Sequence, residues 1–367
     1  MPDSEVDIAI RGAGPVGCAL ALALRDSGLS VRLIGRVARA PAPAPEASTA
    51  RSAFRPLALS YASRLILERI GAWNTLAATT IEEIHISQAG GFGRTRISRN
   101  DLALPALGYV ADYEDVATHL AGLVDPHLRV ADDTNVPRAR LVVHAEGTPE
   151  GQSTEKDYGH TAIVASLVSD RPPHGVAWER FAAEGPLALL PVKGGYGLVW
   201  SRTAFAATPL LNMGDHQFLA AVQAAFGRRA GRFIAAGPRT ATPLALRYHS
   251  ARAAEGEVRI GNAAQTLHPV AGQGLNLGLR DAWDLANLVS ATPRAALGSL
   301  AFAGEFTRLR RMDAQSTIRA TDLMATLFVR RDPIAAALRG LALTALDVFP
   351  PMRRQFTRRM IYGASAW

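Results

Sequence analysis

The sequence contains a single cysteine, Cys18, among its 367 residues. An intrachain disulfide and a cysteine-rich metal site are therefore excluded, and a reducing compartment is favoured. Cys18 follows a cluster of glycines within an apolar segment, so we interpret it as a small buried core residue and not as a reactive thiol.

Long apolar runs are also missing. The longest of them, such as the one between Arg11 and Arg25, fall short of the roughly 20 residues that cross a bilayer. The opening residues MPDSEVDIAI are acidic and lead directly into a strand-like segment, which is not the pattern of a secretory signal. We therefore expect a cytoplasmic protein whose membrane contact is at most peripheral, at the inner face of the membrane.

Acidic residues are outnumbered by basic ones, 32 to 40, which gives a formal net charge of +8. Such a charge suits acidic ligands, an anionic membrane surface or nucleic acid. The basic residues are scattered, however, and aromatic residues make up only 7% of the chain and do not alternate with them along one segment. We therefore expect no nucleic-acid partner. The length and the hydrophobic content of 48% allow roughly two domains with real cores.

The beginning of the chain follows a βαβ pattern. Residues 6–10 predict a buried strand, residues 18–24 a helix that ends near Gly28, and residues 31–34 a second strand. The Pro/Ala-rich segment 39–48 predicts an exposed loop.

The pattern changes twice further along the chain. Between residues 84 and 200, the segments IHIS, VAWERF, LALLPV and YGLVW predict strands of an antiparallel sheet, the last two joined as a hairpin. From about residue 300 onward, stretches rich in Ala, Leu and Arg predict helices, which are interrupted at Pro333 and Pro350.

Three glycines, Gly12, Gly14 and Gly17, form a GxGxxG motif between the first strand and the first helix. The first permits a tight turn, the second lets the backbone approach a ligand, and the third permits close helix packing. A dinucleotide pyrophosphate fits at the N-terminus of such a helix, where free N–H groups and the helix dipole favour negative charge. The motif therefore predicts dinucleotide binding, with a purely structural glycine turn as the alternative.

The acidic residue that usually binds the adenosine ribose is missing. In dinucleotide-binding folds it lies at the end of the second strand, about 20 residues after the glycines. Here Gly35 and Arg36 occupy that place. Either ribose recognition has changed, or Arg36 binds a phosphate as in an NADP-binding fold, or Arg36 is a solvated loop residue.

A second motif lies about two thirds of the way along the chain, in GNAAQTLHPVAGQGLNLGLRDAWDLANLV from Gly261 to Val289. It resembles the second flavin-binding motif of the aromatic-ring hydroxylase flavoproteins, and specifically that of the ubiquinone-biosynthesis hydroxylases. Segments 55–73, 85–98 and 179–192 carry the same resemblance. The Asn in GNAAQT and the segment FGRTRI most resemble the 2-polyprenyl-6-methoxyphenol hydroxylase branch.

The resemblance implies an α/β fold like that of para-hydroxybenzoate hydroxylase. This fold has a Rossmann-like FAD-binding domain, an inserted antiparallel-sheet substrate domain and a helical C-terminal region. We expect the FAD-binding domain to be discontinuous, over residues 1–80, 110–160 and 250–300. The substrate domain is expected at residues 81–109 and 161–249, and the helical region at 301–367.

Roles for individual residues also follow from the resemblance. Asn262 would bond the ribityl or pyrophosphate part of FAD without adding a negative charge beside the phosphates. Pro269 would stiffen the loop near the reactive flavin C4a carbon, and the backbone of Gly272, Gln273 and Gly274 would approach the flavin ring. The helix that follows would direct its positive end toward the flavin. The cofactor-binding candidates of this motif are completed by Gly261, Leu275 and Asn276.

Two further residues have roles by resemblance. Arg55 matches the family arginine near the pyrophosphate, where a guanidinium suits phosphate oxygens, and surface solvation is the alternative. His268 is a catalytic candidate together with Pro269. For His268, a hydrogen bond that orients the loop is favoured over proton transfer.

The reaction that the resemblance implies is a flavin-dependent monooxygenation in ubiquinone biosynthesis. In this family NAD(P)H reduces FAD, O₂ adds to give a flavin C4a-hydroperoxide, and the terminal oxygen is transferred to an electron-rich phenol. The protein must position the aromatic ring and exclude water. The expected partners are a polyprenylphenol substrate, O₂ and other proteins of ubiquinone biosynthesis.

Two departures from the family pattern concern the cofactor site. Ala145-Glu146-Gly147 stands where the family has Ala-Asp-Gly, and the extra methylene of Glu is enough to misplace a hydrogen bond. The acidic ribose ligand is also absent. Two alternatives to an active hydroxylase therefore stay open, namely a catalytically impaired flavin-binding scaffold of the biosynthetic complex and an NADP-binding reductase.

The C-terminal segment FPPMRRQFTRRMIYG combines four arginines with apolar residues. A polyprenylated phenol resides in the bilayer, so an enzyme without a membrane span needs a basic docking face or a delivery partner. We predict peripheral membrane attachment through this segment, with an ordinary packed surface helix as the alternative. The residues concerned are Arg353, Arg354, Arg358, Arg359, Phe349, Phe356, Met360, Ile361 and Tyr362.

Overall fold

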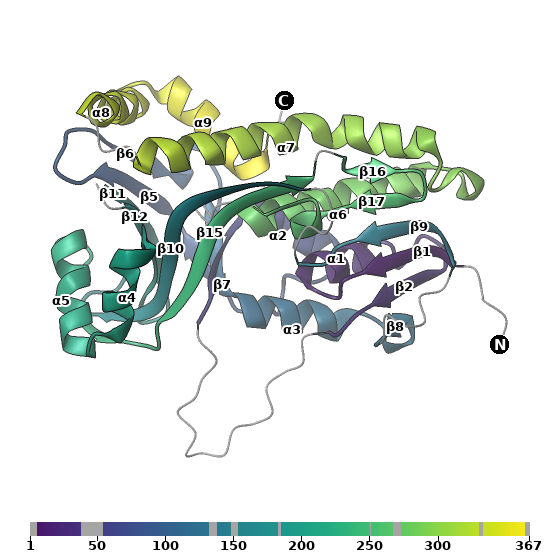
Figure 1. Ribbon diagram of the computed structural model, residues 1–367, viewed down its shortest axis with the longest axis horizontal. Coiled ribbons are helices and arrows are strands. Elements are labelled where there is room, and N and C mark those ends of the chain that lie inside the picture. Colours follow the sequence, from purple (N-terminus) through teal and green to yellow (C-terminus); the bar gives the residue numbers. More distant parts are fainter. Residues whose placement is uncertain are drawn as a thin grey trace, which may run out of the picture.

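One end of the molecule, at the right of Figure 1, is built on a mostly parallel sheet. The structure is a computed structural model that describes residues 6–37, 54–131, 138–147, 153–182, 185–249, 251–266, 273–329 and 333–363. The sheet has the strand order β16-β17-β9-β1-β2-β8, and its edge hairpin β16-β17 is antiparallel. The strands are β1 (Val6–Arg11), β2 (Val31–Ile34), β8 (Arg129–Val130), β9 (Ala139–His144), β16 (Ala253–Ala254) and β17 (Glu257–Arg259).

Buried apolar side chains explain why this sheet forms. Ile8 and Ile10 of β1 have no exposed surface, as expected for a central strand that pairs in parallel with β2 and β9. Helices on the sheet contribute to the same apolar core, and the predicted βαβ unit is confirmed. The predicted loop at 39–48 lies outside the described residues. The core helices are α1 (Pro15–Ala23), α3 (Tyr113–Leu123) and α6 (Gln273–Ala291).

The single cysteine is a core residue, as predicted. Cys18 has no exposed surface, and its Sγ donates to the backbone oxygen of Ala13 at 3.3 Å. Burial raises the pKa of the Cys18 thiol to about 11, so the thiol stays protonated at neutral pH and is a poor nucleophile.

A larger, mainly antiparallel sheet is formed largely by the middle of the chain, as predicted. Its strand order is β18-β15-β10-β13-β12-β11-β5-β6, and β14 pairs with β10. The hairpin predicted from LALLPVKGGYGLVW is confirmed as β12-β13, whereas β11 and β5 run parallel. The strands are β5 (Glu83–Gln88), β6 (Arg94–Ser98), β10 (Ser153–Ser169), β11 (Val176–Ala182), β12 (Gly185–Val192), β13 (Gly195–Thr203), β14 (Phe233–Ala236), β15 (Thr240–His249) and β18 (Gln265–Thr266).

The two faces of this large sheet have different neighbours. Trp178 and Leu189 pack with the two helices at the left of Figure 1, and we call this the outer face. Side chains alternate along a strand, so Ala177 and Leu190 lie on the opposite face, which we call the inner face. There they belong to a separate apolar cluster. The helices on the outer face are α4 (Ala204–Asn212) and α5 (Asp215–Phe226).

A three-stranded sheet of order β3-β7-β4 connects the two larger sheets. Leu59 of β3 is buried in the core of the parallel sheet, whereas its neighbour Ala58 packs against the inner-face cluster. The inner face of the large sheet is therefore directed toward the half of the molecule that carries the glycine motifs. The elements here are β3 (Pro56–Ser60), α2 (Tyr61–Arg69), β4 (Thr79–Ile81) and β7 (Gly108–Asp112).

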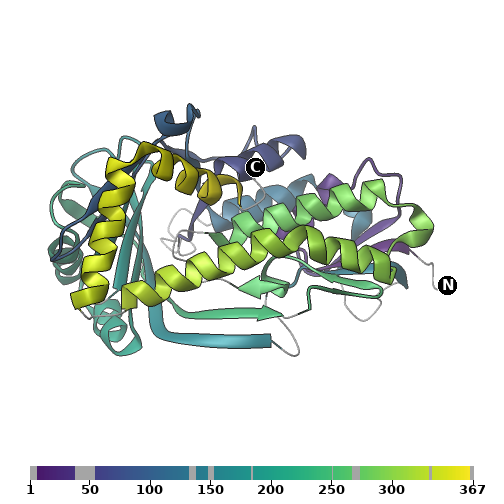
Figure 2. The same ribbon diagram turned by 90° about the horizontal axis from the view of Figure 1, so that it is seen from above.

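Three helices form the C-terminal region, as predicted. They are α7 (Leu300–Val329), α8 (Pro333–Val348) and α9 (Pro350–Tyr362), and the interruptions fall at the two predicted prolines. Figure 2 shows α7 crossing the molecule from the parallel sheet to the large sheet, where α8 turns away from it. Within the described residues, every helix is too short or too polar to span a membrane.

A buried charge cluster holds α7 against α6. Arg310 of α7 exposes 1% of its side chain and donates to Asp281 and Asp313 at 2.7 and 2.8 Å, and also to Asp284. Arg280 of α6 donates to Asp313 at 2.8 Å. Because these charges are withdrawn from water, each one depends on its partners to offset the desolvation penalty.

Replacing Arg310 by Met should lower the free energy of unfolding by about 3–5 kcal/mol, because it leaves buried carboxylates without their cation. Urea denaturation followed by circular dichroism measures the change. Arg308→Met is the matched control, since Arg308 on the same helix forms an exposed pair with Glu305. Equal losses in the two variants would contradict this account of the cluster.

Candidate functional site

The GxGxxG turn is built so that two of its glycines touch backbone and the third borders open space. Gly12 has φ +104°, and a Cβ on it would lie 2.5 Å from the carbonyl of Ala145. A Cβ on Gly17 would lie 1.9 Å from the Gly12 oxygen. A Cβ on Gly14, in contrast, would meet no atom within 4 Å. The open side of Gly14 therefore lies where a ligand can approach the start of α1.

The start of α1 is suited to an anion. Gly14 is its N-cap and supplies no side chain, and Pro15 follows it. The first N–H groups of a helix lack intrahelical partners, and the helix dipole places partial positive charge at this end. Such a helix start can accommodate phosphate groups, and the pyrophosphate site stays a prediction.

The second motif lies directly against the first. A Cβ on Gly261 would lie 3.1 Å from a methyl group of Val16, which belongs to α1. A Cβ on Gly278 of α6 would lie 2.7 Å from the same methyl group and 3.2 Å from the Cα of Gly261. Glycine at these positions thus lets α1, α6 and the turn after β17 meet around Val16. Two segments about 250 residues apart in the chain are therefore in direct contact.

Two candidates of the second motif face open space. Asn262 lies in the short helix η4 (Gly261–Ala263), and its side chain is exposed while both neighbours are buried. A Cβ on Gly274, in the first turn of α6, would meet no atom within 4 Å outside the helix itself. Asp281 accepts a hydrogen bond from the Gly261 N–H at 3.1 Å, which fixes η4 relative to α6. Both positions are thus available to a ligand.

Three other candidates make internal contacts. Asn276 is buried, its Oδ1 accepts from the Ser60 N–H at 2.8 Å, and its Nδ2 donates to the Ala58 oxygen at 2.8 Å. Gln273 donates to the backbone oxygen of Met360 in α9 at 3.4 Å. Leu275 packs against the core of the parallel sheet. Asn276 and Gln273 therefore position α6, and the remaining candidates His268, Pro269 and Gly272 lie outside the described residues.

The two candidate arginines are both exposed. Arg36 follows Gly35. A Cβ added to Gly35 would lie 3.4 Å from the Ala13 nitrogen, so this segment runs beside the glycine turn. The guanidinium of Arg55 lies 4.4 Å from the ring centroid of Tyr113. Both side chains are accessible to an anionic ligand.

Glu146 of the altered Ala-Glu-Gly motif lies next to the glycine turn. Its carboxylate is 3.3 Å from Nε of Arg11 and 3.5 Å from Nδ1 of His144. The Ala145 N–H donates to the Arg11 oxygen at 2.7 Å, which continues the pairing of β9 with β1. The longer Glu side chain therefore has a partner of its own at the end of β1, which the sequence comparison with Ala-Asp-Gly does not reveal.

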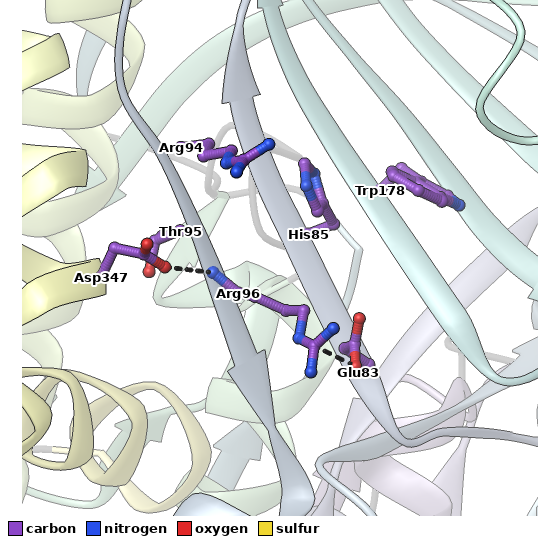
Figure 3. A pocket seen from close by; sticks show the side chains of 7 residues that line it. All are labelled: Glu83, His85, Arg94, Thr95, Arg96, Trp178 and Asp347. Atoms are coloured by element: carbon purple, nitrogen blue, oxygen red, sulfur yellow. Dashed lines mark hydrogen bonds and ion pairs between the residues drawn. The ribbon is translucent and has the colours of Figure 1, made fainter.

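A pocket of about 430 Å³ lies away from this region, at the far edge of the large sheet. Figure 3 shows His85 beside Trp178, with Arg96 reaching Glu83. His85 and Trp178 are on the outer face, their ring centroids 4.8 Å apart. Burial, with the cations Arg229, Arg94 and Arg96 nearby, lowers the pKa of His85. The residues that line this pocket do not belong to either glycine motif.

Sequence reasoning missed one residue on the inner face, Glu179 of β11. It alternates with Trp178 and Arg180, which contact α5 on the outer face, so its side chain points inward. Burial raises the pKa of the Glu179 carboxyl to about 7. The signal that was available is the segment VAWERF, in which every second residue faces inward.

Comparisons with known proteins agree with this geometry. No family model matches the chain. Ubiquinone hydroxylase UbiL of Rhodospirillum rubrum is 31% identical, over 97% of this chain and 89% of the relative. The 3-demethoxyubiquinol 3-hydroxylase of Escherichia coli is 28% identical, over 97% of this chain and 98% of the relative.

Solved structures show the same fold at low identity. The p-nitrophenol 4-monooxygenase PnpA of Pseudomonas putida has a TM-score of 0.74 and 15% identity, covering 98% of this chain and 99% of its own. PqsL of Pseudomonas aeruginosa, a probable FAD-dependent monooxygenase, has a TM-score of 0.69 and 16% identity, covering 93% and 100%. The predicted fold class is confirmed by this likeness.

Stability should depend on pH through Glu179, because its half-buried carboxyl is partly withdrawn from water. Below its ordinary pKa of 4.5 the carboxyl is protonated in both states and carries no penalty. Above about pH 7 it is ionised in both states, and the native state bears the full cost of a desolvated charge, up to about 3 kcal/mol. Glu179→Gln should therefore gain stability over the native sequence as pH rises from 5 to 8. Urea unfolding at the two pH values measures the gain.

The exposed Glu68→Gln variant is the control for this pH dependence, and its effect should be the same at both pH values. A stability difference for Glu179→Gln that does not grow with pH would show that the native carboxyl is well solvated.

Proposed function

The chain belongs to the family of ubiquinone-biosynthesis hydroxylases, which are flavoprotein monooxygenases, and we propose that it binds FAD and hydroxylates a polyprenylated phenol with NAD(P)H and O₂. The observation that carries the proposal is the convergence of the two glycine motifs around Val16. It leaves open backbone at Gly14 and at Gly274, one position for each end of an elongated cofactor.

The residues of the site fit FAD. The uncapped start of α1 suits the pyrophosphate, and the exposed arginine Arg55 supplies a cation for the same group. Asn262 offers a neutral amide to the ribityl hydroxyls. The first turn of α6, open at Gly274, presents helix-dipole charge to the flavin ring. Arg36 stands where the ribose ligand usually lies, so a contact to the adenosine end is assigned to its side chain.

The cofactor and the protein divide the work. When bound, FAD would supply the redox chemistry that uses NAD(P)H and O₂ to transfer one oxygen atom to the phenol. The protein holds the ring and keeps water away. For this task we assign the inner face of the large sheet, where Ile84, Ile86 and Leu190 offer apolar surface.

The division into domains follows the same proposal. Residues 1–80, 110–160 and 250–300 would form the FAD-binding domain, and 81–109 with 161–249 the substrate domain. Residues 301–367 would form the helical extension. His268 and Pro269, in the loop between the two parts of the second motif, are proposed to lie at the flavin ring.

A polyprenyl substrate requires access to a membrane, and α8 carries a surface suited to it. Its apolar residues recur every three to four positions, and several are more than half exposed, among them Leu338, Leu341 and Val348 at 57, 58 and 62%. Phe349 and Met352 extend this row to the start of α9, at 59 and 43%. We call these five residues the α8 stripe. Helices α8 and α9 lie together at the top of Figure 1.

The membrane surface that we propose differs from the one expected from sequence. Ile361 of α9 is buried, and Phe356 and Tyr362 pack against the inner-face cluster. Arg353 donates to both carboxylate oxygens of Asp101 at 3.0 Å. These contacts hold α9 in place with its apolar side packed against the protein, as is usual for an amphipathic helix. Docking therefore falls to the α8 stripe.

Charge favours an anionic bilayer as the occupant of the stripe. Arg354 and Arg358 of α9 are exposed, and the whole chain carries a formal charge of +8. Exposed apolar side chains flanked by arginines suit the interface of a membrane with anionic lipids.

FAD binding is tested with glycine variants that fill the open positions. Gly14→Leu and Gly274→Leu should each raise the Kd for FAD at least tenfold, because the added side chain occupies the space proposed for the cofactor. Flavin absorbance of the purified protein and titration of apo-protein measure the loss. Gly122→Leu is the matched control. Gly122 lies on α3, and a Cβ added to it would also meet no atom within 4 Å.

Activity is tested with the flavin-loaded protein, NAD(P)H, O₂ and a prenylated methoxyphenol. Hydroxylated product by mass spectrometry is the expected result, with NAD(P)H consumption stimulated by the phenol. A yellow protein that makes no product would indicate the scaffold alternative. A protein that stays colourless with excess FAD would remove the proposal and favour the NADP-binding reductase.

Membrane docking is tested by co-sedimentation with vesicles of phosphatidylglycerol and phosphatidylcholine. Replacing Leu338, Leu341 and Val348 by Gln should lower binding at least tenfold, because each loses buried apolar area. Arg354→Gln with Arg358→Gln should weaken binding to anionic vesicles only. The control replaces three exposed apolar residues on other elements by Gln, namely Phe205, Leu300 and Met312. An equal loss in this control would contradict the assignment of the stripe.

A further inference from the structure

Glu179 is a half-buried carboxylate, and the described residues offer it no hydrogen-bond or ion-pair partner. Burial is the sole cause of its raised pKa, so no described charge or hydrogen-bond donor compensates for the lost water. Other buried carboxylates of the described chain, such as Asp281 and Asp313, are bonded to arginines. A Gln side chain has nearly the same shape and would avoid the desolvation cost of an ionisable group at this position.

The position of Glu179 is the inner face of the large sheet. Its cross-strand neighbours are Ile86 of β5 and Ala188 of β12, and the diagonal neighbour Gln88 of β5 has its amide bonded to α8. Such surroundings supply no donor to the carboxylate, whereas an aromatic ring packs well against them.

The inner face near Glu179 is also close to the cofactor half of the molecule. Gly197 is on β13, two strands from Glu179 in the sheet, and is offset from it by two residues along the strand direction. The backbones of the two residues are therefore about 12 Å apart. A Cβ on Gly197 would lie 2.8 Å from Pro56, the residue after Arg55. Glu179 is therefore within the length of a substituted phenol from the segment that carries the pyrophosphate candidate.

We propose that Glu179 accepts a hydrogen bond from the ring hydroxyl of the bound phenol and takes up its proton while the ring is hydroxylated. This inference rests on the proposed function, because it needs a phenol on the inner face. It assigns to Glu179 a catalytic role that concerns the substrate and not the cofactor.

The proton and electron movements balance. The phenol O–H bond breaks, its proton moves to a carboxylate oxygen of Glu179, and the O–H electron pair enters the ring. The ring is then a better nucleophile toward the oxygen atom that the proposed reaction delivers. After the new C–O bond has formed, that ring carbon loses its own proton to water, and Glu179 returns the first proton to the ring oxygen. Glu179 ends as it began.

The geometry explains why the group is suited to this exchange. An ionised carboxylate withdrawn from water gains more from a charge-assisted hydrogen bond than a solvated one does. A base also works best when its pKa is near the operating pH, and burial raises the pKa of Glu179 to about 7.

The test compares Glu179→Gln, Glu179→Asp and the native sequence in FAD-loaded protein between pH 5.5 and 8.5. Product formation by the native protein should rise with pH through about 7, as the carboxylate forms. Glu179→Gln should form product at least 100-fold more slowly, with no such rise, while NAD(P)H consumption continues and yields hydrogen peroxide. Glu179→Asp should restore part of the rate and the pH dependence. Glu68→Gln, on an exposed helix surface, is the control and should match the native profile.

Substrate binding gives a readout that does not depend on turnover. The perturbation of the flavin absorbance reports the Kd of 2-methoxyphenol and of 1,2-dimethoxybenzene, which lacks the hydroxyl. The native protein should bind the phenol at least tenfold more tightly than the ether, and Glu179→Leu should bind the two about equally. Since Glu179→Gln and Glu179→Leu remove a desolvated charge, both are expected to fold, and the flavin content of every variant verifies its folding.

The outcomes separate this inference from the proposed function. If the native protein takes up no FAD or forms no product, the proposed function has failed. If the native protein forms product and Glu179→Gln does so at the native rate with the same pH profile, the proton-accepting role is overturned. Equal preference of native protein and Glu179→Leu for the phenol over the ether overturns the hydrogen bond.

Discussion

The close approach of backbone to backbone around Val16 is the constraint on which the rest of the site depends. Gly261 and Gly278 lack side chains where Val16 packs, and Gly17 lacks one where the turn after β1 passes. A methyl group on Gly261 or Gly278 would separate α1 from α6, and one on Gly17 would separate α1 from the turn after β1, because protein interiors have no spare volume. The buried cluster of Arg310 then holds α7 on α6. The site is thus assembled by packing, before any ligand is considered.

Local patterns allowed much of this fold to be predicted. The strand, glycine turn and helix of the first 34 residues follow from hydrophobic periodicity and from the N-terminal turn chemistry of α1. The hairpin β12-β13 and the breaks at Pro333 and Pro350 have equally local signals, because a turn or a missing N–H acts within a few residues. The resemblance to flavin hydroxylases supplied the long-range arrangement, which no short pattern contains.

Features that depend on tertiary neighbours could not be predicted from the sequence. Asn276 reads as a cofactor ligand in its motif, yet its amide bonds to β3 and thereby positions α6. Of the apolar residues predicted to face a membrane, Phe356, Ile361 and Tyr362 pack in the inner-face cluster, whereas Phe349 is exposed and continues the apolar row of α8. The alternation in VAWERF allows the inward direction of Glu179 to be predicted, but its withdrawal from water appears only when the strands are paired. Each case turns on which partner a side chain meets, and that is set by the fold as a whole.

The central claim is that one elongated cofactor joins the two glycine motifs. Calorimetric titration of the apo-protein with FAD, FMN and ADP tests it most directly, because FMN and ADP each represent one end of FAD. If both motifs hold the same molecule, linking the two ends should make FAD bind at least 100-fold more tightly than either half. Equal affinities for FAD and ADP would show that only the first motif binds nucleotide, and would contradict the account.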